Sequence, residues 1–249
     1  MRTYRLVAVA LVAAFAAWCV AIAGPTAWET QQDNLAFQSE ESNLASMSSR
    51  QGRIVSGIAA KLNPLVAQQY GVPIHYYLTK EVDPDAYSYY GPRVYISTGM
   101  VNLAQYREEV AGVLCHESTH VLHHDGTRSA LETHGHNLAV DNLMARHHAT
   151  FAHLLAIGSN YATLHFTQQQ EYAADRGGAT LCAAAGLNPW GLVWMLKLFQ
   201  TQPDYRTSRW SYLQNHPNNQ NRIAALTKYL KSNSQFATWP SDPRFATRI

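Results

Sequence analysis

Apolar side chains recur every three or four positions along much of this chain, which is the spacing of one face of an α-helix. The first such pattern runs from about Ser42 to Tyr70; Pro64 is expected to kink or break that helix and Gly71 to end it. Further helices are expected at about 101–124, 128–165, 166–185, 191–200 and 222–231. The chain is therefore predicted to be mostly helical.

A different pattern lies between the first two predicted helices. Residues 72–79 are rich in strand-forming side chains, and alternating residues at 93–97 predict a second strand. The turn at Gly91 and Pro92 joins the second strand to residues 86–90 as a hairpin. The expected fold class is α+β: a small sheet with an edge strand, packed on a mainly helical core.

The N-terminus predicts export from the cytoplasm. Arg2 and Arg5 precede an apolar run over residues 6–23, and small residues end that run. This is typical of a secretory signal peptide, which is removed from the mature protein. A retained membrane anchor is the alternative, because the run is just long enough to span a bilayer. Lipid attachment at Cys19 is disfavoured because the bulky Trp18 precedes it.

The rest of the chain is expected to form one domain over residues 42–232. Residues 24–41 are polar and aperiodic and predict a flexible lead, and residues 233–249 predict an irregular tail. Formal net charge is +2 and only 14% of residues are charged, so there is no basic field to favour nucleic acid as a partner.

The chemistry is concentrated in His116, Glu117 and His120, an H-E-x-x-H pattern inside an apolar helical run. Residues four apart stand one turn apart on nearly the same helix face, so both imidazoles can bind one cation. Glu117 lies beside that cation without facing it directly. A carboxylate there can take the proton of an attacking water. The pattern predicts a zinc site, against the alternative of a surface helix with two unrelated histidines.

A third ligand is expected further along the chain. Glu171 and Asp175 are four residues apart on a predicted helix, so both carboxylates share one face. Glu171 can complete the three protein ligands of a catalytic zinc ion, and Asp175 can orient a ligand histidine through its second ring nitrogen. The small residues that surround them, among them Gly177 and Gly178, would let a neighbouring helix approach closely.

Several other side chains leave alternatives open. Cys115 and Cys182 lie on the two ligand-bearing helices and could form a disulfide, although two buried free thiols are slightly preferred. His123, His124 and Asp125 are interpreted as polar residues at a helix end instead of ligands. The histidines at 134, 136, 147, 148 and 153 match no recognised ligand spacing and are expected to be solvated.

The combination of H-E-x-x-H with E-x-x-A-D resembles the gluzincin peptidases typified by HtpX and the CAAX prenyl endopeptidase, with their soluble bacterial envelope relatives. The resemblance runs from about residue 43 to about residue 225. Residues 85–100 are similar to that family's N-A-F-A segment, hairpin and T-G helix start, with Asp85 where Asn is usual. His216 and Pro217 with Arg222 resemble its H-P…R element.

The resemblance implies that His116, His120 and Glu171 bind one zinc ion per chain and that Glu117 is the base. It also implies that His216 lies by the zinc, where it stabilises the transition state or covers the metal. Arg222 belongs to the surroundings of the ligands. Arg222 and Tyr172 are weaker candidates than His216 for stabilising the oxyanion.

These features together predict a metalloendopeptidase that hydrolyses peptide bonds in misfolded or unassembled cell-envelope proteins. An extended peptide would add as a strand beside Ala86, Tyr87 and Ser88. The expected location is the periplasm or cell envelope, with possible membrane association through the N-terminus. The alternative from another class is a zinc-bound envelope chaperone or assembly factor with weak or no proteolysis.

Overall fold

The structure, a computed structural model, describes residues 24–130, 166–203, 210–216 and 219–249. The predicted signal peptide and the histidines between residues 131 and 165 lie outside the described residues, as does Pro217. No helix among the described residues is long and apolar enough to cross a membrane. The helices are α2 (Ala27–Glu40), α3 (Arg50–Tyr70), α4 (Thr98–Leu103), α5 (Arg107–Leu122), α8 (Gln168–Ala184), α9 (Gly191–Gln200), α10 (Ser211–Asn215) and α11 (Asn219–Ser232).

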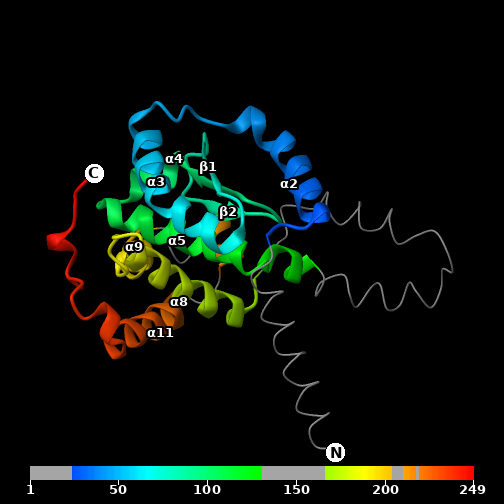
Figure 1. The fold of residues 1–249 in the computed structure, drawn as a ribbon. Helices are drawn as coiled ribbons and strands as arrows, with labels where there is room; N and C mark the ends of the chain where they lie inside the picture. Colours follow the sequence, from blue (N-terminus) through cyan, green and yellow to red (C-terminus); the bar gives the residue numbers. More distant parts are fainter. Residues whose placement is uncertain (1–23, 131–165, 204–209, 217–218) are drawn as a thin grey trace, which may run out of the picture.

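A small sheet of three strands lies on one side of this helical body (Figure 1). Strand β1 (His75–Thr79) pairs in parallel with β3 (Arg93–Ser97), and β2 (Ala86–Ser88) pairs with β3 in antiparallel fashion. The strand order β1-β3-β2 leaves β2 at an edge. The predicted hairpin and the α+β, mostly helical fold class are therefore confirmed.

Helix α5 is the centre of the molecule. Figure 1 shows it between the sheet and the layer formed by α8 and α9. Nearly every residue of α5 is buried, including the polar run from His116 to His120. The hydroxyl of Ser118 bonds the carbonyl of Leu114 and the hydroxyl of Tyr76 on β1. A helix enclosed on all sides holds its side chains in fixed positions.

The expected flexible lead at residues 24–41 is wrong over most of its length, because residues 27–40 form helix α2. Thr26 and Glu29 form a capping box that starts the helix. The helix has almost no apolar face, so periodicity could not reveal it. Long-range polar contacts hold it instead: Glu29 bonds His124 and Thr127, and Asp33 pairs with Arg93.

Two predicted helix boundaries also change. The first long helix begins at Arg50 instead of about Ser42, because Ser49 caps it by accepting from Gly52, and it continues through Pro64 without a break. The helical region expected at 101–124 is two helices, α4 and α5, separated by a short segment that ends at Tyr106.

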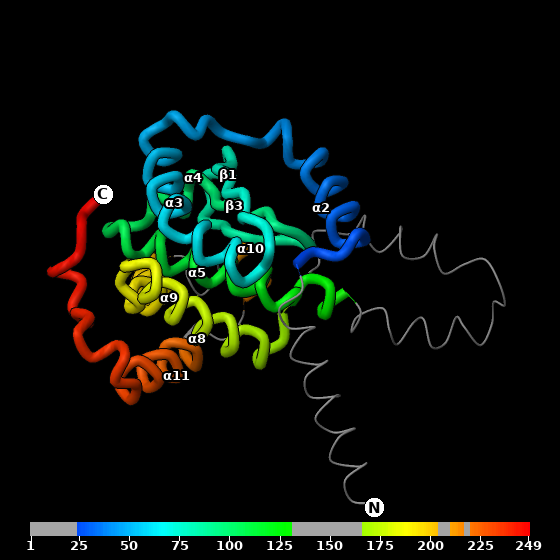
Figure 2. The backbone as a smooth tube through the Cα atoms, viewed as in Figure 1, coloured from blue at the N-terminus to red at the C-terminus, as the bar shows by residue number. Residues whose placement is uncertain are grey.

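The C-terminal tail contains two short 3-10 helices, Ser234–Phe236 and Pro243–Phe245, and it is packed against the body. Figure 2 shows it leaving α11 and passing along one side of the molecule to the region where α5 begins. The backbone of Arg107 donates to Thr247, and Trp194 donates its indole N–H to the carbonyl of Ser241. The tail therefore covers the ends of α5 and α9 and contributes to the core through Phe236.

We expect the substitution Gly112→Ala to lower the free energy of unfolding by roughly 1–3 kcal/mol or more. A Cβ atom at Gly112 would lie 2.1 Å from the backbone nitrogen of Leu192, so α5 and α9 would have to separate. Denaturant unfolding measures the change. The matched control is Gly57→Ala on α3, whose Cβ would meet only the mobile end of the Arg107 side chain. Equal stability of the two variants would contradict this interpretation of the packing.

Candidate metal centre

Helix α5 supplies three of the polar side chains at the centre of the molecule. His116 and His120 lie one turn apart, with Nε2 atoms 3.1 Å apart, and Glu117 follows the first histidine. All three side chains are buried. The arrangement is the one that the spacing of the motif predicts for a helix.

Helix α8 brings Glu171 and Asp175 to the same place. The approach is close because Gly178 faces α5: a Cβ atom there would lie 3.0 Å from the backbone nitrogen of His116. Glu171 reaches the histidines with Oε1 at 3.3 Å from His120 Nε2 and Oε2 at 3.7 Å from His116 Nε2. The small residues of α8 thus allow the close helix contact that the sequence predicted.

A disulfide between Cys115 and Cys182 joins the two helices beside this contact. Cys115 directly precedes His116, and both sulfur-bearing side chains are buried. The preference for two free thiols was wrong. Whether the two sulfur atoms can bond depends on the distance between helices α5 and α8, and the sequence does not contain that distance. The bridge ties the backbone that carries two histidines to the backbone that carries Glu171 and Asp175.

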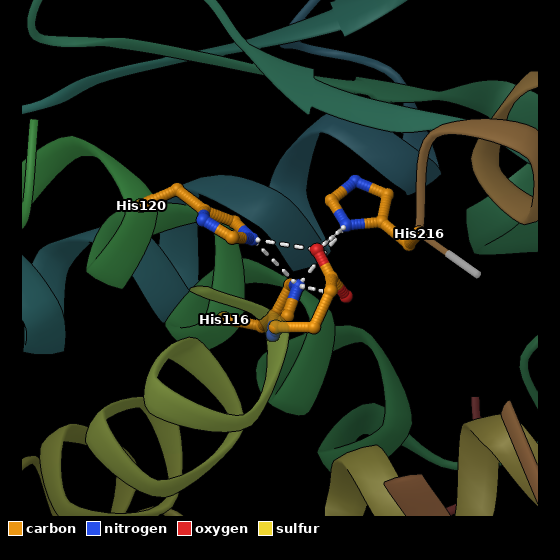
Figure 3. Close-up of side chains that lie close together, drawn as sticks. His116, His120 and His216 are labelled. Carbon is orange, nitrogen blue, oxygen red and sulfur yellow. Dashed lines mark hydrogen bonds and ion pairs between the residues drawn. The ribbon is translucent and has the colours of Figure 1, made fainter. Parts of the chain in front are cut away.

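His216, at the end of α10, is the fourth member of the group. Its Nδ1 atom lies 2.8 Å from Glu171 Oε1 and 3.3 Å from His116 Nε2. One donor atom from each of His116, His120, Glu171 and His216 lies within 4.8 Å of the others. Figure 3 shows the three imidazoles converging on the carboxylate from two separate segments of chain.

The far ring nitrogens of the α5 histidines are held by carboxylates. Asp175 Oδ1 lies 3.1 Å from His116 Nδ1, as the sequence predicted, and Asp125 Oδ2 lies 2.9 Å from His120 Nδ1. Such contacts set the orientation of each ring and leave Nε2 free to bind a metal. Arg222 is completely buried between the carboxylates, 2.7 Å from Asp175 Oδ1 and 2.6 Å from Glu171 Oε2.

The pKa values of these groups follow from burial and from their charged neighbours. Burial, aided by the charge of Arg222, lowers the pKa of His116 to about 3, which keeps it neutral. Burial also acts to lower the pKa of His120, but hydrogen bonds to Asp125 and Glu171 outweigh it and raise the pKa to about 10. Burial raises the pKa of Glu117. Without a metal, the carboxylates therefore favour a positive charge at His120.

A divalent cation fits this centre. Both carboxylate oxygens of Glu117 are buried without a hydrogen-bond partner. Unpartnered buried groups of this kind cost free energy unless a ligand or water satisfies them. Three nitrogens with one carboxylate are a donor set that suits zinc or a similar transition metal.

Most of the predicted site residues come together, and some do not. Arg222 contacts the carboxylates of Glu171 and Asp175. Tyr87 and Ser88 line a cavity that also contains His216, whereas Ala86 is buried and does not line it. The hydroxyl of Tyr172 accepts a hydrogen bond from Gln168 on the exposed side of α8, away from the donors, which removes it as an oxyanion donor.

Sequence reasoning missed the contribution of Asp125. It interpreted this residue as part of a polar helix end, and neither His123 nor His124 joins the donor group. The chain turns sharply at His124, whose φ of 55° is in the left-handed region, and this brings Asp125 back to His120. It also missed Phe166, whose ring stacks on His120 at 4.0 Å between centroids. No local pattern signals either contact.

The buried histidine–carboxylate group is an arrangement that could hold a metal ion. Residues 50–230 match the model of Peptidase family M48, and the chain belongs to that family. This confirms the resemblance to HtpX and its relatives that the motifs indicated.

Individual relatives are more distant. The chain is similar to the Beta-barrel assembly-enhancing protease of Escherichia coli K12, with 26% identity over 162 residues, 61% of this chain and 33% of the relative. It is similar to the protein of the same name from Yersinia pestis, with 26% identity over 65% of this chain and 36% of the relative. The chain thus spans about a third of the length of the curated relatives it matches.

We expect Asp175→Asn and Asp125→Asn each to weaken zinc binding by about 10- to 100-fold, because each removes the charged acceptor that orients a histidine. Competition with a chromogenic chelator measures the affinity. The matched control is Asp242→Asn, which changes one charge at a position far from the centre, in the C-terminal tail. Zinc affinity in either variant equal to that of the control would show that these carboxylates do not support the ligands.

We expect the double variant Cys115→Ala/Cys182→Ala to unfold with a free energy about 2–4 kcal/mol lower than the wild type. The bridge joins residues 67 positions apart in sequence, so its loss frees a long loop in the unfolded chain. Urea unfolding measures the difference, and fully reduced wild-type protein is the control. Coincident unfolding curves for oxidised and reduced protein would contradict this stabilising contribution.

Proposed function

We propose that this chain is a zinc-dependent endopeptidase that acts on misfolded or unassembled proteins of the cell envelope. The observation that carries the proposal is the convergence of His116, His120 and Glu171 on one point, with the unpartnered carboxylate of Glu117 beside it. His116, His120 and Glu171 would hold one zinc ion. When bound, zinc would polarise the carbonyl of the scissile bond and make a bound water more acidic.

Glu117 is the proposed general base. Its carboxylate is completely buried and accepts no hydrogen bond from the described residues, so both oxygens are available to a water molecule. Burial raises its pKa, which makes it a stronger base than an exposed carboxylate. It would take a proton from the attacking water and give that proton to the amine of the leaving segment, so that the peptide bond ends as an acid and an amine.

His216 is the proposed partner for the negative charge that develops on the carbonyl oxygen. Its Nε2 atom lies 3.4 Å from Glu117 Oε1, so it stands next to the reacting groups. In the present arrangement its Nδ1 atom also lies among the ligand atoms, 2.8 Å from Glu171. It can therefore serve either as an oxyanion donor or as a cover over the metal, and the position supports both roles.

Strand β2 is the proposed binding edge for an extended peptide. It has β3 on one side only, and its residues Tyr87 and Ser88 line the same cavity as His216. Addition of a strand at this edge reads the backbone of the substrate and suits unfolded segments. The relatives named as β-barrel assembly-enhancing proteases support the choice of envelope proteins during assembly as substrates.

We expect Glu117→Gln to abolish hydrolysis of unfolded casein while zinc is still bound, because the amide cannot accept the proton. Peptide release measures activity, and elemental analysis with a thermal unfolding curve measures metal content and folding. Glu108→Gln, on the same helix but away from the donor group, is the control and is expected to keep its activity.

The same variant separates the proposal from a chaperone or assembly role. A protease would lose its biological effect in the Glu117→Gln form, whereas a zinc-bound assembly factor would keep it. Cleavage of casein by zinc-loaded Glu117→Gln at the wild-type rate would overturn the assignment of the base.

A further inference from the structure

The cavity beside the metal centre contains acidic side chains that the reaction itself does not use. It has a volume of about 230 Å³ and lies between the edge strand β2, the start of α8 and the end of α10. That volume is below the range of drug-sized ligand pockets and suits a single side chain. Glu40, Glu81 and Asp85 line it together with His216.

Two of the three carboxylates are held in place by neutral donors. Glu40 accepts from the hydroxyl of Tyr87 at 2.9 Å and from that of Tyr89 at 2.7 Å. Glu81 accepts from the side chains of Asn43 and Thr79. These bonds fix the direction of the carboxylates without neutralising them.

Asp85 is the least satisfied of the three. Its Oδ1 atom accepts from the backbone of Ala86 at 2.9 Å, and its other oxygen accepts no hydrogen bond from the described residues. Burial raises the pKa of this carboxyl to about 7. A cation placed beside it would favour the charged form and reverse that shift.

No lysine or arginine forms an ion pair with these three carboxylates in the part of the chain that the structure describes, and His216, which lines the same cavity, is the group whose charge acts to lower the pKa of Asp85. Elsewhere in the same structure, two buried carboxylates do face a cation: Asp33 pairs with Arg93, and Asp175 pairs with Arg222. Three half-buried carboxylates without a counter-ion are costly unless a ligand supplies the positive charge.

The cavity adjoins the reacting groups of the proposed peptidase through His216. His216 is 1% exposed, and its Nε2 atom has no hydrogen-bond partner. The same atom lies 3.4 Å from Glu117 Oε1. The edge of β2, which has no strand beside it among the described residues, forms the wall of the same cavity. An extended peptide on that edge would present alternate side chains to the two faces of the sheet.

We propose that Asp85, assisted by Glu81 and Glu40, selects substrates that carry a lysine or arginine next to the bond that is cleaved. The inference rests on the proposed peptidase function and adds the class of substrate. The positive side chain would enter the cavity and replace the missing counter-ion. Asp85 is thus a specificity-determining residue and takes no part in the proton transfers.

The test uses zinc-loaded full chain and a set of peptides that are identical except at one position near the cleaved bond. That position carries Lys, Arg, Gln or Glu. We expect kcat/KM for the Lys and Arg peptides to exceed that for the Gln peptide by about tenfold or more, with the Glu peptide lowest. The preference should fall as salt is added, because screening weakens the charge pair.

The variant Asp85→Asn should remove most of this preference and the double variant Asp85→Asn/Glu81→Gln nearly all of it, while the Gln peptide is still cleaved. The matched control is Asp83→Asn. This substitution also removes one negative charge, two residues before Asp85, but the side chain of Asp83 is exposed and lies outside the cavity. Equal kcat/KM for the Lys and Gln peptides, or a preference unchanged in the double variant, would overturn the inference.

A binding assay separates this inference from the proposed function. In the Glu117→Gln background, fluorescence anisotropy with the same labelled peptides measures affinity without hydrolysis. The inference would be supported, even if no peptide is cleaved, if the Lys and Arg peptides bind more tightly than the Gln peptide and Asp85→Asn abolishes that difference. Cleavage of every peptide at the same rate would support the proposed function and contradict the inference.

Discussion

The close contact between α5 and α8 is the constraint on which the rest of the structure depends. Gly178 places the backbone of α8 against the backbone at His116, and the disulfide at Cys115 joins the helices at the same level. A Cβ atom there would lie 3.0 Å from the nitrogen of His116, so the two backbones would have to move apart by a few tenths of an ångström. Because Glu171 comes from one helix and the histidines from the other, the donor group exists only while this contact holds.

The same contact encloses a network of charges. Arg222, with no exposed surface, lies between two carboxylates of α8, and these carboxylates reach the histidines of α5. Removing charges from water is expensive, and their mutual attraction compensates only when the geometry is good. The centre therefore resists small movements of any member, and that rigidity is what a catalytic metal site requires. The oxygens of Glu117 are the part of this network without a hydrogen-bond partner, which is what the proposed role as a base needs.

Local sequence patterns were sufficient for the elements that carry the chemistry. The helices at 191–200 and around 222–231, the hairpin, and the placement of His116, Glu117 and His120 on one helix all follow from periodicity and short motifs. So does the sharing of one face by Glu171 and Asp175. In each case the information lies within a few turns of helix or one strand, where side-chain direction depends on spacing alone. Family resemblance added His216, which no periodicity would have found.

What the amino-acid sequence determined by itself was therefore most of the described helices and the strands, together with the candidate donors. Only the tertiary structure decided that residues 27–40 are a helix, because polar contacts to distant segments hold α2 in place of an apolar face. It also decided the disulfide, the return of Asp125 to His120 and the grouping of three carboxylates beside β2. Each of these depends on the distance between segments that are remote in the chain, and local spacing contains no information about that distance.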